Sequence, residues 1–241
     1  SFRPDLEAEV DLIEEVARLH GLDKIPAAAP QSRIVPGVND GFVRAAGAGR
    51  EALVGLGLTE IMNYSLLSDK LLAPCSDGRT GHRVALPRPI SADQSILRDS
   101  LLPQMIETLG RNRARQVETA SLFEIGRVFY RDAQGALAED QRLAIGLMGP
   151  AGRVGFESRA AVEPEDAFLW LKGILEALCQ RLFIRAGDRP AEAGAPAGLG
   201  FMDLKPETPQ DGLYGLGCLE KGRGAFITLD GAICGAMGLI H

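Results

Sequence analysis

Apolar and polar positions near the start of the chain follow the spacing of a helix. Apolar side chains recur at three- and four-residue steps from a start near Pro4 to an end at Gly21, where glycine is a common terminator. A stretch rich in proline and glycine follows at residues 27–38 and lacks this period. We therefore predict two domains: residues 1–30 form the closing helix and exit loop of one domain, and residues 31–241 form a second domain.

The rest of the chain alternates between helical and extended patterns. Apolar stripes predict three helices, one from a cap at Asn39 or Asp40 to Gly55 and two more over residues 101–113 and 166–182. Alternating or short apolar runs predict strands over residues 58–66, 96–98, 122–130, 143–148, 225–229 and 232–240, with residues 185–200 as a loop.

The order of these elements indicates an α+β fold. Helices fall between pairs of neighbouring strands, and the last two strands form a hairpin whose Asp230-Gly231 turn favours type I′ geometry. This order predicts a mainly antiparallel sheet flanked by helices. A regular strand–helix–strand alternation and a glycine-rich phosphate loop are both missing, which excludes Rossmann and P-loop domains.

The length of the apolar runs and the spacing of the cysteines indicate where in the cell the protein is expected. No apolar run approaches the ~20 residues of a membrane helix, so we expect no membrane association. The spacing of the four cysteines excludes a zinc knuckle or a closely spaced redox pair. We predict that Cys179, Cys218 and Cys234 are buried small apolar residues, and that the protein is cytoplasmic.

The charge of the chain weighs against direct binding of nucleic acid. The formal net charge is −6, whereas proteins that neutralise phosphates usually present a basic surface. One basic cluster, Arg111, Arg113 and Arg115, ends a predicted helix. A solvated helix end, where the helix dipole favours cations, is the expected role, and a tRNA contact is the alternative.

The first predicted helix carries the best candidate chemistry. Asp11, Glu14 and Glu15 lie at i, i+3 and i+4 and share one face, where three carboxylates repel one another unless water or a cation neutralises them. A hard cation such as Mg²⁺ is the natural counter-ion for such oxygens. Asp5 is about 120° from that face in an ideal helix and joins it only from a frayed first turn. Periodicity leaves a solvated acidic face and a metal site both open.

Several segments, in order along nearly the whole chain, resemble the bacterial phenylalanyl-tRNA synthetase beta subunit. They are Arg3-Pro4-Asp5-Leu6 with Asp11-Leu12-Ile13-Glu14-Glu15-Val16-Ala17-Arg18, Gly57-Leu58-Thr59-Glu60-Ile61 with Asn63-Tyr64-Ser65, Pro89-Ile90-Ser91 with Leu97-Arg98-Asp99-Ser100-Leu101-Leu102-Pro103, and Leu122-Phe123-Glu124-Ile125-Gly126-Arg127-Val128-Phe129. A weaker match covers Lys172-Gly173 and Gly222-Arg223-Gly224-Ala225. The open ends of the chain fit an internal fragment of such a subunit.

This resemblance implies a fold, partners and cofactors. Residues 1–30 would end a winged-helix-like domain, and residues 31–241 would be a non-catalytic core like that of class II aminoacyl-tRNA synthetases. The partner would be the catalytic alpha subunit, in a heterotetramer of two alpha and two beta subunits that binds tRNA(Phe) and uses ATP. The resemblance also implies a Mg²⁺ site shared with the alpha subunit and matched here by Asp5, Asp11, Glu14 and Glu15.

The cations that amino-acid activation requires are incomplete in this chain. Class II chemistry places arginines against the developing phosphate charge, but here Arg98 precedes a helix and Arg127 lies in a strand. Glu124 and Arg127 are an odd number of positions apart and should face opposite sides of that strand. We therefore expect structural support for phenylalanyl-tRNA formation. A stand-alone class II-like amino-acid-activating ligase and an RNA-binding module are the alternatives.

Overall fold

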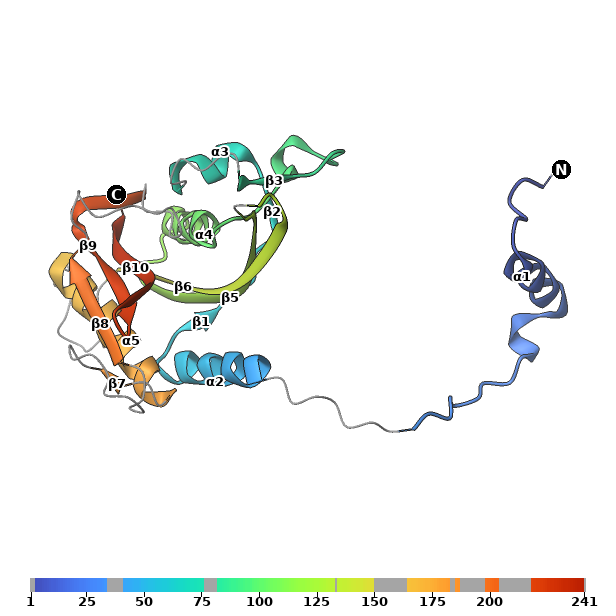
Figure 1. Cartoon of the computed structure of the whole chain (residues 1–241), viewed down its shortest axis with the longest axis horizontal. Helices are drawn as coiled ribbons and strands as arrows, with labels where there is room; N and C mark the ends of the chain where they lie inside the picture. Colours follow the sequence, from blue (N-terminus) through green and yellow to red (C-terminus); the bar gives the residue numbers. More distant parts are fainter. Residues whose placement is uncertain are drawn as a thin grey trace. The chain divides into compact units, whose positions relative to one another are not determined.

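A computed structural model gives the architecture of the chain (Figure 1). The structure describes residues 3–33, 41–75, 82–132, 134–149, 164–182, 185–186, 198–203 and 218–240. The chain divides into two compact units, Ser1–Asn39 and Asp40–His241. The assignment of residues 1–30 to the end of a winged-helix-like domain stays a prediction.

The first unit contains helix α1 (Glu9–His20) and the short 3-10 helix η1 (Leu22–Lys24). Gly21 separates them with a φ of 101°, a backbone conformation that glycine adopts without a steric penalty. The predicted start near Pro4 is wrong, because Pro4 and Asp5 lie in a turn and the helix begins at Glu9. No residue of α1 is buried within this unit.

The second unit contains the remaining helices and strands. Its helical segments are α2 (Gly41–Gly55), α3 (Asp69–Leu72), η2 (Ala73–Cys75), η4 (Ala92–Gln94), α4 (Leu102–Ala114) and α5 (Pro164–Arg181). Its strands are β1 (Thr59–Glu60), β2 (Leu66–Leu67), β3 (Val84–Ala85), β4 (Ile96–Leu97), β5 (Ala120–Arg131), β6 (Leu137–Met148), β7 (Arg185–Ala186), β8 (Gly198–Asp203), β9 (Leu219–Leu229) and β10 (Ala232–Ile240). The three long predicted helices are confirmed, although the proposed cap at Asn39 or Asp40 lies outside the described residues.

The described strands form three sheets, with the orders β1-β5-β6, β10-β9-β8-β7 and β2-β4-β3. The pairs β1–β5 and β7–β8 are parallel, and the other described pairs are antiparallel. The long β5–β6 hairpin curves around α4, which contacts both of its strands (Figure 1). The predicted α+β class with a mainly antiparallel sheet is confirmed.

Strand β5 separates two apolar clusters because its successive side chains point to opposite faces. Phe123 is fully buried with Leu53 of α2 and Leu178 of α5. Its neighbour Leu122 packs on the other side, against Met105 of α4. Burial of a large apolar side chain stabilises the fold by ~1.5–3 kcal/mol. These contacts hold β5 between α4 on one face and α2 with α5 on the other.

Two predicted segments differ from the structure. The strand expected over residues 58–66 is broken into β1 and β2, because Asn63 leaves the sheet edge and binds Glu124. The loop expected over residues 185–200 contains β7, which pairs with the start of β8, while the residues between them lie outside the described part.

The final hairpin has the predicted turn. Asp230 and Gly231 have φ values of 52° and 80°, as type I′ geometry requires. The Asp230 side chain also accepts a hydrogen bond from the Gly198 amide at 2.7 Å, which ties the turn to β8. Among the described helices, none is both long and apolar enough to cross a membrane.

Candidate functional site

A buried ion pair occupies the space between β5 and α4. Arg98, which follows β4, is 4% exposed, and Glu124 of β5 is 2% exposed. The Arg98 Nη1 donates to Glu124 Oε1 at 2.6 Å, and its Nε donates to the Arg127 carbonyl at 2.9 Å. A charge is tolerated in a protein interior only when it is paired and hydrogen-bonded, and this guanidinium meets both conditions.

Three further polar side chains complete this network. Asn63 donates from Nδ2 to the second oxygen of Glu124 at 2.8 Å. Gln104 of α4 accepts from Arg98 at 3.3 Å and donates to the Tyr64 carbonyl at 2.7 Å. Thr108, one turn further along α4, donates to the Asn63 side chain at 3.5 Å. The network therefore joins the segment after β1, β5 and α4.

Strand periodicity explains which charges enter the network. Glu124 lies on the face of β5 that packs against α4, whereas Arg127 is exposed and pairs with Glu139 of β6 at 3.2 Å. This confirms that Glu124 is a structural ion-pair member and that Arg127 lies at the solvated rim, on opposite sides of the strand. The Arg98 guanidinium hydrogen-bonds to protein groups and is buried, so a phosphate in solution does not reach it.

An open cleft of about 520 Å³ lies between β6, α5 and β10. Its walls are largely apolar, with Leu143 of β6 and Leu171 of α5 among them. Among its described lining residues, Arg142 alone carries a guanidinium, and Arg142 pairs with Asp140 at 3.4 Å. Asp140 also accepts a hydrogen bond from Tyr130 at 2.9 Å, which raises the pKa of that phenol.

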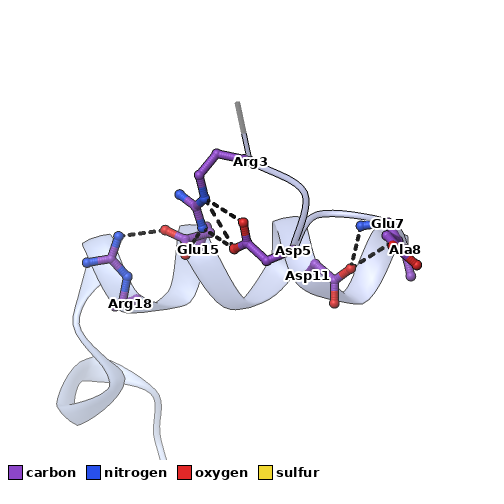
Figure 2. A network of polar contacts seen from close by, with 7 residues as sticks. All are labelled: Arg3, Asp5, Glu7, Ala8, Asp11, Glu15 and Arg18. Carbon is purple, nitrogen blue, oxygen red and sulfur yellow. Dashed lines mark hydrogen bonds and ion pairs between the residues drawn. The ribbon is translucent and has the colours of Figure 1, made fainter. Parts of the chain in front are cut away.

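In the first unit, two of the four predicted metal ligands converge on one cation, the guanidinium of Arg3 (Figure 2). Arg3 donates to Asp5 at 2.7 Å and to Glu15 at 3.0 Å. Arg18 binds the other oxygen of Glu15 at 2.5 Å. Asp5 and Glu15 raise the pKa of Arg3, and Arg3 holds the pKa of Asp5 below its ordinary value. The pKa of Glu15 is lowered by Arg18 first and by Arg3 second.

The other two predicted ligands do not join this pair. Asp11 accepts hydrogen bonds from the Ala8 and Glu7 amides at 2.7 and 2.8 Å (Figure 2). These bonds lower the pKa of Asp11, with Ala8 the larger cause, and they fix the start of α1. Glu14 is exposed on the helix.

Carboxylate oxygens such as those of Asp5 and Glu15 suit a hard cation. In this structure, however, the Arg3 guanidinium lies between these two carboxylates. Across the described residues, no group of three or more His, Cys, Asp or Glu side chains is gathered to hold a metal ion. A metal at these carboxylates would therefore have to displace Arg3. Asp11 would in addition have to leave the backbone amides that it binds.

The basic cluster lies at a solvated helix end, as expected. Arg111 and Arg113 are in the last turn of α4, and Arg111 pairs with Glu107 at 2.8 Å on the exposed surface. The predicted burial of the cysteines is wrong for Cys234, which is exposed, while Cys179 and Cys218 are half-buried. Cys234 lies on β10, the edge strand of its sheet.

Sequence reasoning did not identify Asn63, Gln104 or Arg3 as site residues. Asn63 and Gln104 have no local signal, because they meet Glu124 and Arg98 only after distant segments pack together. Arg3 lies close to Asp5 in sequence, so a charge-pairing argument would have found that contact. Its contact with Glu15 requires the turn that precedes α1.

This fold defines the class of protein: it is the fold of class II aminoacyl-tRNA synthetases. The pyrrolysyl-tRNA synthetase of Desulfitobacterium hafniense matches 91% of this chain and 61% of its own, with a TM-score of 0.54 at 13% identity. The ATP phosphoribosyltransferase regulatory subunit/histidyl-tRNA synthetase of Bacillus halodurans matches 75% of this chain and 41% of its own, with a TM-score of 0.51 at 10% identity. At these identities the likeness concerns the fold alone.

Within that class, the chain belongs to the family of the phenylalanyl-tRNA synthetase beta chain CLM domain, whose model matches residues 25–241. Relatives named phenylalanine–tRNA ligase beta subunit include those of Moorella thermoacetica, 38% identical over 77% of this chain, and Geobacillus kaustophilus, 34% identical over 100% of it. The matches cover 23% and 27% of those proteins, so the chain spans about a quarter of their length.

Proposed function

We propose that this domain supports phenylalanyl-tRNA formation as a non-catalytic part of the beta subunit of phenylalanine–tRNA ligase. The observation that carries the proposal is the burial of Arg98 against Glu124. In a class II fold, activation of an amino acid needs cations held against the phosphates of ATP. Here the buried Arg98 guanidinium pairs with Glu124 instead, and the open cleft is largely apolar.

The work of the domain, on this proposal, is to hold the catalytic alpha subunit in an assembly of two alpha and two beta subunits. ATP and tRNA(Phe) would be bound by that complex, in the cytoplasm, rather than by this domain alone. The family membership supports this reading, because the relatives carry the name of a beta subunit. A stand-alone amino-acid-activating ligase and an RNA-binding module have no specific observation in their favour.

The segment after β1 is the surface we assign to contact with the alpha subunit. Met62 is 92% exposed and Tyr64 is 77% exposed, although both side chains are large and largely apolar. Asn63 between them turns inward to Glu124, so the buried network fixes the direction of its two neighbours. Aromatic and methionine side chains are enriched at protein interfaces.

Co-purification tests this assignment. The tagged chain is coexpressed with the alpha subunit of the same ligase, and the fraction of alpha subunit retained is measured. We expect stable retention by the parent chain and a loss of at least tenfold for the Met62→Asp, Tyr64→Asp double variant. Leu137→Asp, at an exposed position that is 62% accessible at the start of β6, is the matched control and should retain the partner. Equal retention by all three chains would refute the assigned surface, and no retention by the parent chain would refute the subunit role.

We further propose that Asp5, Asp11, Glu14 and Glu15 bind Mg²⁺ in the complex after Arg3 is displaced. Asp11 and Glu14 would have to turn toward Asp5 and Glu15, and the ion would then neutralise the four carboxylates and join this face to the alpha subunit. The contacts of Arg3 support the proposal, because they mark a position where Asp5 and Glu15 already meet a cation.

Titration with Mg²⁺ by calorimetry tests the metal proposal. We expect the alpha–beta complex to bind the ion and the variant with all four carboxylates changed to Ala to lose that binding. Arg3→Ala should tighten binding, because the competing guanidinium is gone. Arg18→Ala is the control for loss of a positive charge at the same carboxylate, since Arg18 binds only the far oxygen of Glu15. Indistinguishable titrations of the parent and quadruple variant would refute the site.

A further inference from the structure

Two strands at the ends of different sheets line the same cleft. β6 ends the sheet β1-β5-β6, and β10 ends the sheet β10-β9-β8-β7, so neither strand pairs with another described strand on its outer side. Both line the open cleft of about 520 Å³, β6 with residues 140–145 and β10 with residues 234–237. Figure 1 shows β10 beside β6.

The cleft meets the edges of these two strands rather than their faces. Successive side chains of a strand point to opposite faces, so a pocket on one face would touch alternate residues. This cleft instead touches consecutive residues of both strands. The edge of a sheet presents a row of backbone N–H and C=O groups that can pair with a further strand. The cleft is therefore bordered on two sides by hydrogen-bonding edges.

Helices cover this cleft on both faces of the sheet. Leu171 and Leu175 of α5 line one side, and Leu101 and Leu102 at the start of α4 line the other. The two helices pack on opposite faces of β5. A strand that is buried on both faces carries apolar side chains at consecutive positions. The partner that fits this cleft is therefore an extended and nearly continuously apolar peptide segment.

The cleft has room for a short stretch of such a segment. With a rise of ~3.3 Å per residue, a strand spacing of ~4.8 Å and a layer of ~10 Å, one strand residue takes up roughly 160 Å³. A volume of about 520 Å³ therefore admits roughly three residues. This length is close to that of the β10 run, residues 234–237, that borders the cleft.

We propose that a segment of the beta subunit outside residues 1–241 inserts as a strand between β6 and β10 and joins the two sheets into one. The proposal rests on the proposed function, because it takes this chain to be part of a beta subunit. The named relatives are about four times as long as the part that this chain matches, so they contain further segments.

The source of the strand follows from the state of the two edges. Open edges beside an apolar cleft promote aggregation unless they are covered during folding. A segment of the same polypeptide is held at a high effective concentration throughout folding. A segment of the alpha subunit arrives only on assembly. This difference favours the beta subunit itself as the source.

Hydrogen exchange followed by mass spectrometry tests the inserted strand. Three samples are compared: this chain alone, this chain with the alpha subunit, and the complete alpha–beta complex. We expect the amides of residues 143–145 and 235–237 to exchange about tenfold more slowly in the complete complex than in the chain alone, because a bonded amide exchanges only after local opening. The edge strand β3, which does not border the cleft, should exchange equally in these two samples.

A charged variant of the complete complex tests the site itself. Leu143 lines the cleft and is 40% exposed, so Leu143→Asp places a carboxylate at the β6 edge. We expect this change to restore fast exchange to residues 235–237 on the opposite side of the cleft. Leu169→Asp is the matched control, because Leu169 is a 61% exposed residue of α5 outside the cleft lining, and it should leave that exchange unchanged.

The comparison of the unsubstituted samples decides the matter even if a variant fails to fold. Equal exchange of residues 143–145 and 235–237 in the chain alone and in the complete complex would overturn the proposal. Slow exchange in this chain with the alpha subunit would also overturn it, because the alpha subunit would then supply the strand. Retention of the alpha subunit is measured in the same samples. Its loss while the slow exchange persists would contradict the subunit role and support the inserted strand.

Discussion

At the scale of single residues, burial decides what each arginine does. Arg98 has 4% of its side chain exposed and pairs with a glutamate that is 2% exposed, whereas Arg127 is 64% exposed and pairs with Glu139 at the surface. If the Arg98 guanidinium left Glu124, an unpaired charge would remain buried in the core, at a high cost in free energy. The Arg127 guanidinium can exchange its partner for water at little cost.

Replacing Arg98 with Met should therefore destabilise the chain strongly. Glu124 would lose its partner while Asn63 still fixes its position, and loss of one member of a buried pair costs ~3–5 kcal/mol. Urea unfolding followed by circular dichroism measures the change.

Arg127→Met is the matched control for this substitution, because it removes the same type of side chain from an exposed ion pair of the same unit. We expect a change of at most ~1 kcal/mol, typical of an exposed ion pair. Equal losses in the two variants would contradict a structural role for Arg98.

Some residue roles were predictable from sequence and others were not. The odd spacing of Glu124 and Arg127 on a strand was enough to place them on opposite faces, which the structure confirms. The spacing of Asp11, Glu14 and Glu15 was not enough to show their partners. Asp11 binds backbone amides before the helix, and Glu15 binds Arg3, which lies outside it.

At the scale of elements, the start of α1 depends on a carboxylate. Asp11 accepts from the Glu7 and Ala8 amides, and this lowers its pKa below the ordinary value of 3.8. A lowered pKa in the folded state means that the contribution is present above pH 3.8 and is lost as the pH falls through the lower folded value.

Acidification should therefore release the first turn of α1. We expect the NMR amide signals of Glu7 and Ala8 to titrate together, with a midpoint below 3.8, and to move toward exposed-amide positions. Asp11→Asn removes the titrating group and should abolish the transition. A midpoint at or above 3.8 would contradict the two hydrogen bonds to Asp11.

Two glycines should respond in opposite directions to the same change. Gly231 has a φ of 80° in the hairpin turn, where alanine costs ~1–2 kcal/mol. Gly47 lies within α2 with open space around the position of a Cβ, and alanine there should stabilise by ~0.5–1 kcal/mol. Thermal unfolding of Gly231→Ala and Gly47→Ala checks both signs, and changes of the same sign would contradict these backbone assignments.

Element prediction succeeded where the signal was local. Helices α2, α4 and α5 carry long apolar stripes, and the Asp230-Gly231 pair specifies its turn. Strands β1 and β7 pair with only two residues each, so their existence depends on partners far along the chain. No window of sequence contains that information.

At the scale of the whole molecule, the chain has the fold of class II aminoacyl-tRNA synthetases. The core is of the class II synthetase type, and the family is that of a beta chain domain. Arg98 is buried between β5 and α4, where it donates a hydrogen bond to Glu124. The segment after β1, in contrast, exposes the large side chains of Met62 and Tyr64, where we propose that the alpha subunit binds.

We propose that this domain assists catalysis without performing it. The most direct test is phenylalanine-dependent ATP–pyrophosphate exchange, measured with the purified chain, with the alpha subunit and with the two together. We predict no exchange above buffer for the chain alone and full exchange for the complex, unchanged by Arg142→Met in the cleft. Exchange by the chain alone that depends on phenylalanine and is lost in Arg142→Met would contradict the account.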